Sequence, residues 1–243
     1  MSSELLFYCT IMFVLTLAGG LVTLIRQWSD EWLHLFLSFG AGIFLGAVFF
    51  HLLPEVMKLE HSYRAGLFIL GGYLLIFFIE RILLSREGGG HGHGHVVVSL
   101  TVLIGLSVHS LMEGFGLAVT MVDPQLAWIL LVSILAHKIP AAFSLVSLAL
   151  LAKQSRLRSF YYLLLFSVTA PAGALVLGPL LGLDHAGAMW QTTGLVTGSF
   201  LYVATADLLP EVFHSPKRRW VNLFLMLVGI TLMSLVGAQS DHH

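Results

Sequence analysis

His109 and Glu113 are the pair of residues whose chemistry stands out, because both lie inside one long apolar run. They are four positions apart, so on an α-helix their side chains share one face, one turn apart. An imidazole nitrogen and a carboxylate oxygen in that relation can hold a single divalent cation, and zinc accepts both atom types. His137 lies at a matching depth in the next apolar run and offers a third ligand. We call these three residues the candidate metal site.

Ser110 and Lys138 are polar residues that directly follow two of these ligands. At bilayer depth such side chains are costly unless paired or hydrated, so each suggests a function. A serine hydroxyl can complete the coordination of a metal ion. A lysine ammonium repels a divalent cation, yet it can neutralise surplus carboxylate when no ion is bound, or stand where another ion would bind. Both residues are therefore candidates for an additional part of the site.

Two further pairs repeat the four-residue spacing near the ends of apolar runs, His51 with Glu55 and Asp207 with Glu211. Such pairs can attract a cation and pass it along at the two mouths of a path through the membrane. The alternative is that they are ordinary solvated helix ends. Separately, the loop 85–95 ends in alternating glycine and histidine. This composition is typical of flexible metal capture, here by His91, His93 and His95.

The composition requires that membrane-spanning helices position these residues. Of the 243 residues, 57% are hydrophobic and 10% are charged, and the mean hydropathy is +0.90. Soluble domains contain about 25% charged residues, so this chain lacks the polar surface that water demands. A net charge of −1 also argues against a nucleic-acid partner, which needs a surplus of basic residues. The predicted surroundings are the lipid bilayer.

Eight apolar runs have the length of about 20 residues that a transmembrane helix needs. They cover residues 4–25, 32–56, 66–84, 96–121, 125–151, 159–182, 190–212 and 219–238. The first run is longer than the core of a signal peptide and has no basic residue before it, so we expect a retained span. Because the connections are short, we predict one all-α integral membrane domain over residues 1–243.

The loops also predict an orientation, because basic residues gather on the cytoplasmic side of a membrane. One set of loops holds nine arginines and lysines, whereas the opposite set holds only Lys58 and Arg64. Both termini are therefore expected outside the cytoplasm, and the loop 85–95 inside it. The expected location is a cell membrane, either a bacterial inner membrane or a plasma membrane.

Residues 42–56 and 198–212 form an internal repeat. They read GIFLGAVFFHLLPEV and GSFLYVATADLLPEV and share eight of fifteen positions. In the predicted orientation these two helices run in opposite directions, as in the inverted repeats of many transporters. The alternative is that LLPE is simply a common ending of apolar helices.

The segments around the candidate metal site resemble the ZIP family of divalent metal transporters. HSLMEGFGLA, residues 109–118, is similar to the HSxxEG form of the family's fourth-span signature, and AHKIPAAFSL, residues 136–145, is similar to its fifth-span partner. The resemblance covers essentially the whole chain. It implies a three-plus-two-plus-three bundle in which helices 1–3 and 6–8 form the inverted repeat. It also implies a metal site between the fourth and fifth spans and uptake toward the cytoplasm, by a transporter rather than an enzyme.

Four positions depart from the pattern of many family members. Ser110 replaces an asparagine, Lys138 an acidic or polar ligand, Ala141 a glutamate or histidine, and Ala170 a glutamate before the proline. All four would contribute to a second metal site in the family. The departures therefore predict transport of one metal at a time, with the Lys138 ammonium in the second position. Water, Ser110 or another helix must then complete the coordination of the first metal.

Other interpretations stay open at this point. An intramembrane histidine can be a packing residue, and a histidine–glutamate pair can be a structural ion pair. The whole chain could instead be an exporter of the cation-diffusion type, an intramembrane metal-dependent hydrolase or a non-transporting metal receptor. Zinc is the expected substrate, with Fe²⁺, Mn²⁺ and Cd²⁺ as alternatives that the ligand types alone do not separate. A homodimer is also an open alternative.

Overall fold

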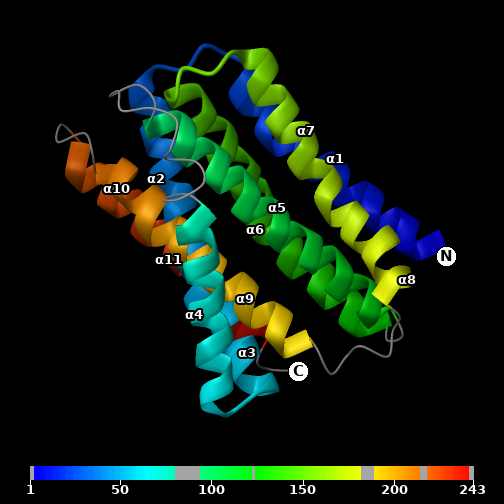
Figure 1. The fold of residues 1–243 in the computed structure, drawn as a ribbon. Coiled ribbons are helices and arrows are strands. Elements are labelled where there is room, and N and C mark those ends of the chain that lie inside the picture. Colours follow the sequence, from blue (N-terminus) through cyan, green and yellow to red (C-terminus); the bar gives the residue numbers. More distant parts are fainter. Residues whose placement is uncertain (1–2, 80–93, 122–123, 182–188, 214–217, 241–243) are drawn as a thin grey trace.

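The computed structural model describes residues 3–79, 94–121, 124–181, 189–213 and 218–240. Within these ranges the regular structure is helical (Figure 1). The α-helices are α1 (Ser3–Ile25), α2 (Asp30–Ala47), α3 (Leu53–Leu59), α4 (Tyr63–Phe78), α5 (Gly94–Thr120), α6 (Pro124–Leu151), α7 (Arg156–Ala172), α8 (Gly178–Leu181), α9 (Met189–Tyr202), α10 (Leu209–Phe213) and α11 (Arg219–Ser240). Short π-helical turns join consecutive helices at η1 (Val48–Leu52), η4 (Gly173–Leu177) and η6 (Val203–Leu208).

Helices occupy the described part of every predicted apolar run. Six of them are long and apolar enough to cross a membrane, at Ser3–Ile25, Asp30–Leu59, Val102–Thr120, Leu130–Leu151, Arg156–Leu180 and Arg219–Gly237. Tyr63–Phe78 is a shorter apolar helix, and α9, η6 and α10 together fill the seventh run. The prediction of an all-helical membrane protein is thus confirmed.

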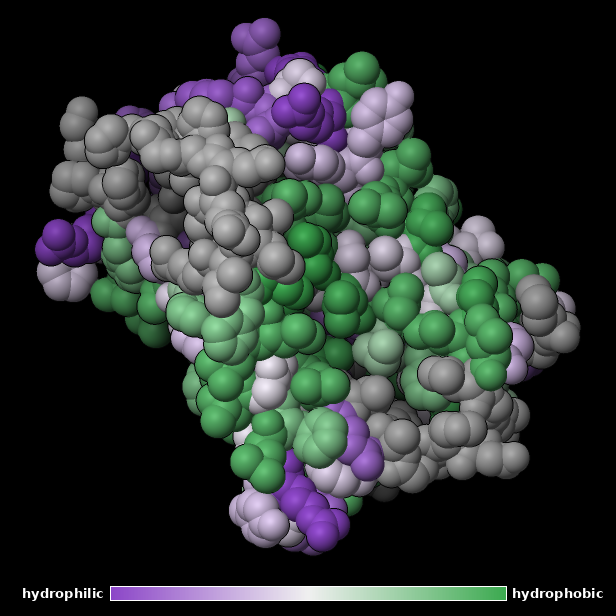
Figure 2. All heavy atoms as spheres, in the orientation of Figure 1, coloured by the Kyte–Doolittle hydropathy of each residue, from purple (hydrophilic) through white to green (hydrophobic). Residues whose placement is uncertain are grey.

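The surface has the apolar belt expected of a protein that lies in lipid. Large apolar side chains such as Phe7, Leu165 and Phe224 are more than half exposed on the outer faces of their helices. Figure 2 shows hydrophobic side chains over the middle of one face and hydrophilic side chains gathered toward both ends. Apolar patches of this extent are unusual on a water-soluble monomer, and lipid contact accounts for them.

The helices pack in two groups. In the first, α1 contacts α6 and α7, while α5 contacts both α6 and α7; we call this group the ligand unit. In the second, α2 packs on α11 and α4 packs on α9; we call this group the flanking unit. The two units meet where α2 contacts α6 and where α9 contacts α5. Figure 1 shows the ligand unit on one side of the molecule and the flanking unit on the other.

Glycines bring helix backbones together inside each unit. A Cβ atom on Gly114 of α5 would lie 1.9 Å from the carbonyl oxygen of Ala170 on α7. A Cβ atom on Gly198 of α9 would lie 1.8 Å from the carbonyl oxygen of Ile69 on α4. Only glycine permits such close approach. These contacts fix α5, which carries two of the candidate ligands, against α7, and they fix α9, which lies beside α5, against α4.

Candidate metal site

Two long helices of the ligand unit position the three predicted ligands. His109 and Glu113 lie one turn apart on α5, and His137 lies on α6 beside them. Proline marks α6 twice: Pro124 opens it, where no backbone N–H is needed, and Pro140 lies inside it. Because Pro140 has no N–H, the carbonyl four residues before it, next to His137, loses its usual helical partner.

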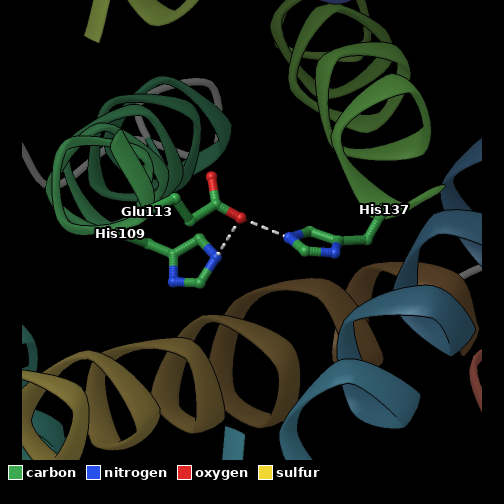
Figure 3. A group of neighbouring side chains, drawn as sticks. All are labelled: His109, Glu113 and His137. Carbon is green, nitrogen blue, oxygen red and sulfur yellow. Dashed lines mark hydrogen bonds and ion pairs between the residues drawn. The ribbon is translucent and has the colours of Figure 1, made fainter. Parts of the chain in front are cut away.

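The three side chains converge on one carboxylate oxygen. His109 Nε2 lies 2.9 Å from Glu113 Oε1, and His137 Nε2 contacts the same oxygen (Figure 3). The candidate ligand atoms of all three residues lie within 4.8 Å of one another. The histidines are buried, with 4% of His109 and 5% of His137 exposed. Two nitrogens and one oxygen at this spacing are within reach of a single zinc ion, whose bonds to them are about 2.0–2.2 Å long.

The other oxygen of the same carboxylate serves a different partner. Lys138 Nζ contacts Glu113 Oε2 and donates a hydrogen bond of 2.8 Å to Ser110 Oγ. Its ammonium also lies 5.5 Å from the centre of the Phe166 ring on α7, within the range of a cation–π interaction. Lys138 is 2% exposed, so these contacts must offset the free-energy cost of burying its positive charge. One carboxylate therefore faces two imidazoles on one side and an ammonium on the other.

A chain of hydroxyl groups supports the lysine. Thr169 Oγ1 on α7 lies 2.7 Å from Ser110 Oγ and 2.6 Å from the carbonyl oxygen of Phe166. Because a carbonyl only accepts and each hydroxyl carries one proton, Thr169 donates to Phe166, Ser110 donates to Thr169, and Lys138 donates to Ser110. Sequence reasoning missed Thr169 and Phe166, since a single hydroxyl or aromatic residue in an apolar run gives no distinctive signal.

The flanking unit covers the two imidazoles. The ring of Phe200 on α9 lies against that of His109, with centroids 3.8 Å apart. The ring of His51 in η1 lies 6.4 Å from that of His137. His51, predicted at a mouth of the path, thus stands close to the candidate metal site. Neither His109 Nδ1 nor His137 Nδ1 has a hydrogen-bond partner among the described residues.

Most of the remaining predicted residues lie in the segments that continue α2 and α9 of the flanking unit. His51 and Asp207 occupy π-helical turns, and each turn directly precedes the LPE segment of its repeat. Such turns are rare and often mark functional positions. Asp207 is buried and Glu55 is exposed. Of the others, Glu211 is part of α10 and His95 part of α5, but their side chains lie outside the described residues, as do His91 and His93 altogether.

Comparison with known proteins adds evidence of a different kind. The family described as "ZIP Zinc transporter" matches residues 3–95 and 84–237. Protein zntD of Dictyostelium discoideum is 31% identical over 148 residues, which are 58% of this chain and 22% of that protein. Zinc transporter ZIP9 of Micropogonias undulatus is 32% identical over 173 residues, 64% of this chain and 55% of that protein. Zinc transporter ZIP9-B of Xenopus laevis is 27% identical over 251 residues, 82% of this chain and 83% of that protein.

Proposed function

The chain belongs to the ZIP family of zinc transporters, and from this premise we propose that it carries zinc across the membrane through the candidate metal site. Family membership makes it a transporter rather than an enzyme. The observation that carries the proposal is the convergence of His109, Glu113 and His137, whose ligand atoms lie within 4.8 Å of one another in the buried middle of two long apolar helices. Buried polarity of this kind is costly in a bilayer, and binding a cation accounts for it.

A modest affinity suits a carrier, because an ion that enters must also leave. The candidate metal site offers three protein ligands, and the outer ring nitrogens of its histidines have no partner among the described residues. Ligand histidines usually donate from that nitrogen to a carboxylate or carbonyl, which raises their basicity. Because the described residues provide no such hydrogen bond, the histidines should bind zinc less tightly and release it more easily. Ser110 or water would complete the coordination of the ion.

One metal at a time is the stoichiometry that the surroundings of Glu113 favour. The Lys138 ammonium contacts Oε2, where a second cation would otherwise share the carboxylate. Ala141 and Ala170 are buried and offer no ligand in place of the glutamate or histidine and the glutamate expected there in many family members. The ammonium thus supplies the charge that a second metal would bring.

For the path, we infer entry past Glu55 and His51 and exit past Asp207 and Glu211, toward the cytoplasm. The excess of basic residues in one set of loops supports this orientation, with both termini extracytoplasmic, and the loop 85–95 would capture ions as they emerge.

Two observations support the inverted repeat. Helix α2 packs on α11 as α9 packs on α4, and η1 and η6 occupy matching repeat positions. The three-plus-two-plus-three arrangement and a homodimer stay predictions.

Zinc uptake into proteoliposomes tests the function. The wild type is expected to accumulate ⁶⁵Zn²⁺, His109→Ala to fall to the level of empty liposomes, and the matched control His61→Ala, at an exposed histidine outside the site, to behave as wild type. Equal uptake by wild type and His109→Ala would show that the site is wrong. No uptake by the wild type would overturn transport itself.

A further inference from the structure

We propose that Phe200 of the flanking unit is the positioning residue for His109, and that it sets how tightly the candidate metal site holds its ion. This inference rests on the proposed function of the site. Phe200 touches no candidate ligand atom by hydrogen bonding; its contact is the ring packing against His109, with centroids 3.8 Å apart and planes inclined by 40°.

The need for such a residue follows from the hydrogen bonds of His109. A metal-binding histidine is normally oriented by a hydrogen bond from its second ring nitrogen. His109 Nδ1 is buried and has no partner among the described residues. Its Nε2 faces Glu113, but this nitrogen lies close to the Cβ–Cγ axis, so the contact restrains rotation of the ring about that axis only weakly. Packing is therefore what holds the imidazole plane.

Phe200 can hold the His109 ring in place because its own side chain is tightly packed. It is 1% exposed and packs on Phe44 of α2, also 1% exposed, with ring centroids 4.9 Å apart. Two residues before it, Gly198 brings α9 against the backbone of α4, so the helix that carries Phe200 is fixed as well. A rigid aromatic face thus lies along the His109 ring.

His137 provides the contrast. Its Nδ1 also lacks a partner among the described residues, but its nearest ring neighbours are His109 at 5.7 Å and His51 at 6.4 Å. These contacts are looser than that of Phe200 with His109. We infer that His109 is the fixed ligand and His137 the adjustable one. The flanking unit then controls the affinity for zinc by holding the His109 ring in place.

The decisive variant is Phe200→Leu, which stays apolar but removes the flat face. Loss of groups that orient a ligand typically weakens metal binding by about 10–100-fold. We expect the KM for zinc uptake to rise about tenfold with a smaller change in kcat. As a second readout, Co²⁺ bound to the purified protein reports coordination geometry through its visible absorption, and Phe200→Leu is expected to weaken that absorption as water enters the coordination.

Three further proteins separate positioning from general packing. Phe44→Leu loosens the support of Phe200 but leaves its ring against His109, and it is expected to change the KM and the Co²⁺ spectrum much less than Phe200→Leu does. Phe200→Tyr keeps the ring and is expected to restore both. If Phe200→Leu does not fold, Phe200→Met, which fills similar space without a ring, replaces it and is expected to show the same changes.

The inference is overturned if Phe200→Leu, or its replacement, keeps the wild-type KM and Co²⁺ spectrum, or if Phe44→Leu changes both as much. Its failure differs from failure of the proposed function. In the first case wild type still transports zinc and His109→Ala does not; in the second, wild type itself shows no uptake, or His109→Ala transports as well as wild type.

Discussion

The helices that carry the candidate ligands and the helix α9 beside them bury polar side chains in different ways. On α5 and α6 of the ligand unit the buried groups bind across helices: Glu113 of α5 contacts His137 and Lys138 of α6. On α9 of the flanking unit, Thr197 and Ser199 donate to carbonyl groups of their own helix. The first pattern makes the charged residues depend on one another, whereas the second pairs each hydroxyl within one helix.

This difference suggests a division of tasks. Under the proposed function the ligand unit holds the ion, because its charged and imidazole groups form one connected network around Glu113. The flanking unit supplies the aromatic face of Phe200 and the polar residues His51 and Asp207 in π-helical turns. Changes in the ligand unit should therefore alter binding, and changes in the flanking unit should alter passage or fine-tune affinity.

The largest effect is expected from Glu113→Gln. It removes the carboxylate that serves both imidazoles and the ammonium, so zinc uptake should fall to background. It also leaves the buried Lys138 without its ion-pair partner, which typically costs about 3–5 kcal/mol, and thermal unfolding in detergent should show this loss. Glu4→Gln, at an exposed residue of α1, is the control. Uptake retained by Glu113→Gln would end the claim that the ligand unit holds the ion.

Lys138→Met tests the single-ion stoichiometry. Two unit charges about 4 Å apart interact by roughly 4 kcal/mol at an effective dielectric constant near 20. Removing the ammonium should therefore raise the equilibrium affinity for zinc by up to about a thousandfold, and it should slow turnover because release becomes harder. Zinc titration against a competing chelator measures the affinity and the number of ions bound. Lys58→Met, at an exposed residue of α3, is the control, and an unchanged affinity in Lys138→Met would contradict the assigned role.

Asp207→Asn probes the flanking unit. Asp207 is buried in η6 and contributes no atom to the group of His109, Glu113 and His137. We expect zinc to bind with wild-type affinity and to be transported severalfold more slowly, because the proposed exit loses a negative charge. Equilibrium titration and initial uptake rates give the two quantities separately. A large loss of affinity with an unchanged rate would erase the distinction between the units.

The smallest effect is expected where the units are joined by an exposed ion pair. Lys153 follows α6 and contacts Asp30 of α2 at 2.9 Å, with both side chains more than half exposed. Its φ of 57° lies in the left-handed region. The backbone N–H of Lys153 donates to the carbonyl oxygen of Leu150, and the N–H of Gln154 donates to that of Ala149. These two hydrogen bonds form a Schellman motif at the C-terminus of α6. Such a backbone costs a non-glycine residue about 1–2 kcal/mol.

Lys153→Gly and Lys153→Ala separate the two contributions. Glycine removes the backbone strain and loses an exposed pair worth about 0–1 kcal/mol, so it should leave thermal stability equal or slightly higher. Alanine loses the pair and keeps the strain, so it should be slightly less stable. The gap between alanine and wild type should shrink at high salt. If the Lys153→Gly variant were less stable than Lys153→Ala, strain in the left-handed backbone would not explain the difference in stability.

Much of the candidate site could be predicted because its signals are local. A four-residue spacing sets two side chains on one face of an α-helix wherever the helix lies, which predicted the pairing of His109 with Glu113. A histidine in an apolar run stands out without any alignment, which identified His137. Phe200, Phe166 and Thr169 could not be found this way, because their residue types are common in membrane helices and only their neighbours give them a role.

The sequence by itself determined that this protein is an all-helical membrane protein with candidate metal ligands inside its apolar helices, because composition and helical spacing depend on nothing distant in the chain. Only the tertiary structure decided how α9 meets α5, so that Phe200 covers His109, and how one carboxylate is shared between two imidazoles and an ammonium. Those contacts join residues far apart in sequence. Their distances depend on the close glycine crossings of helices in each unit, which no local pattern specifies.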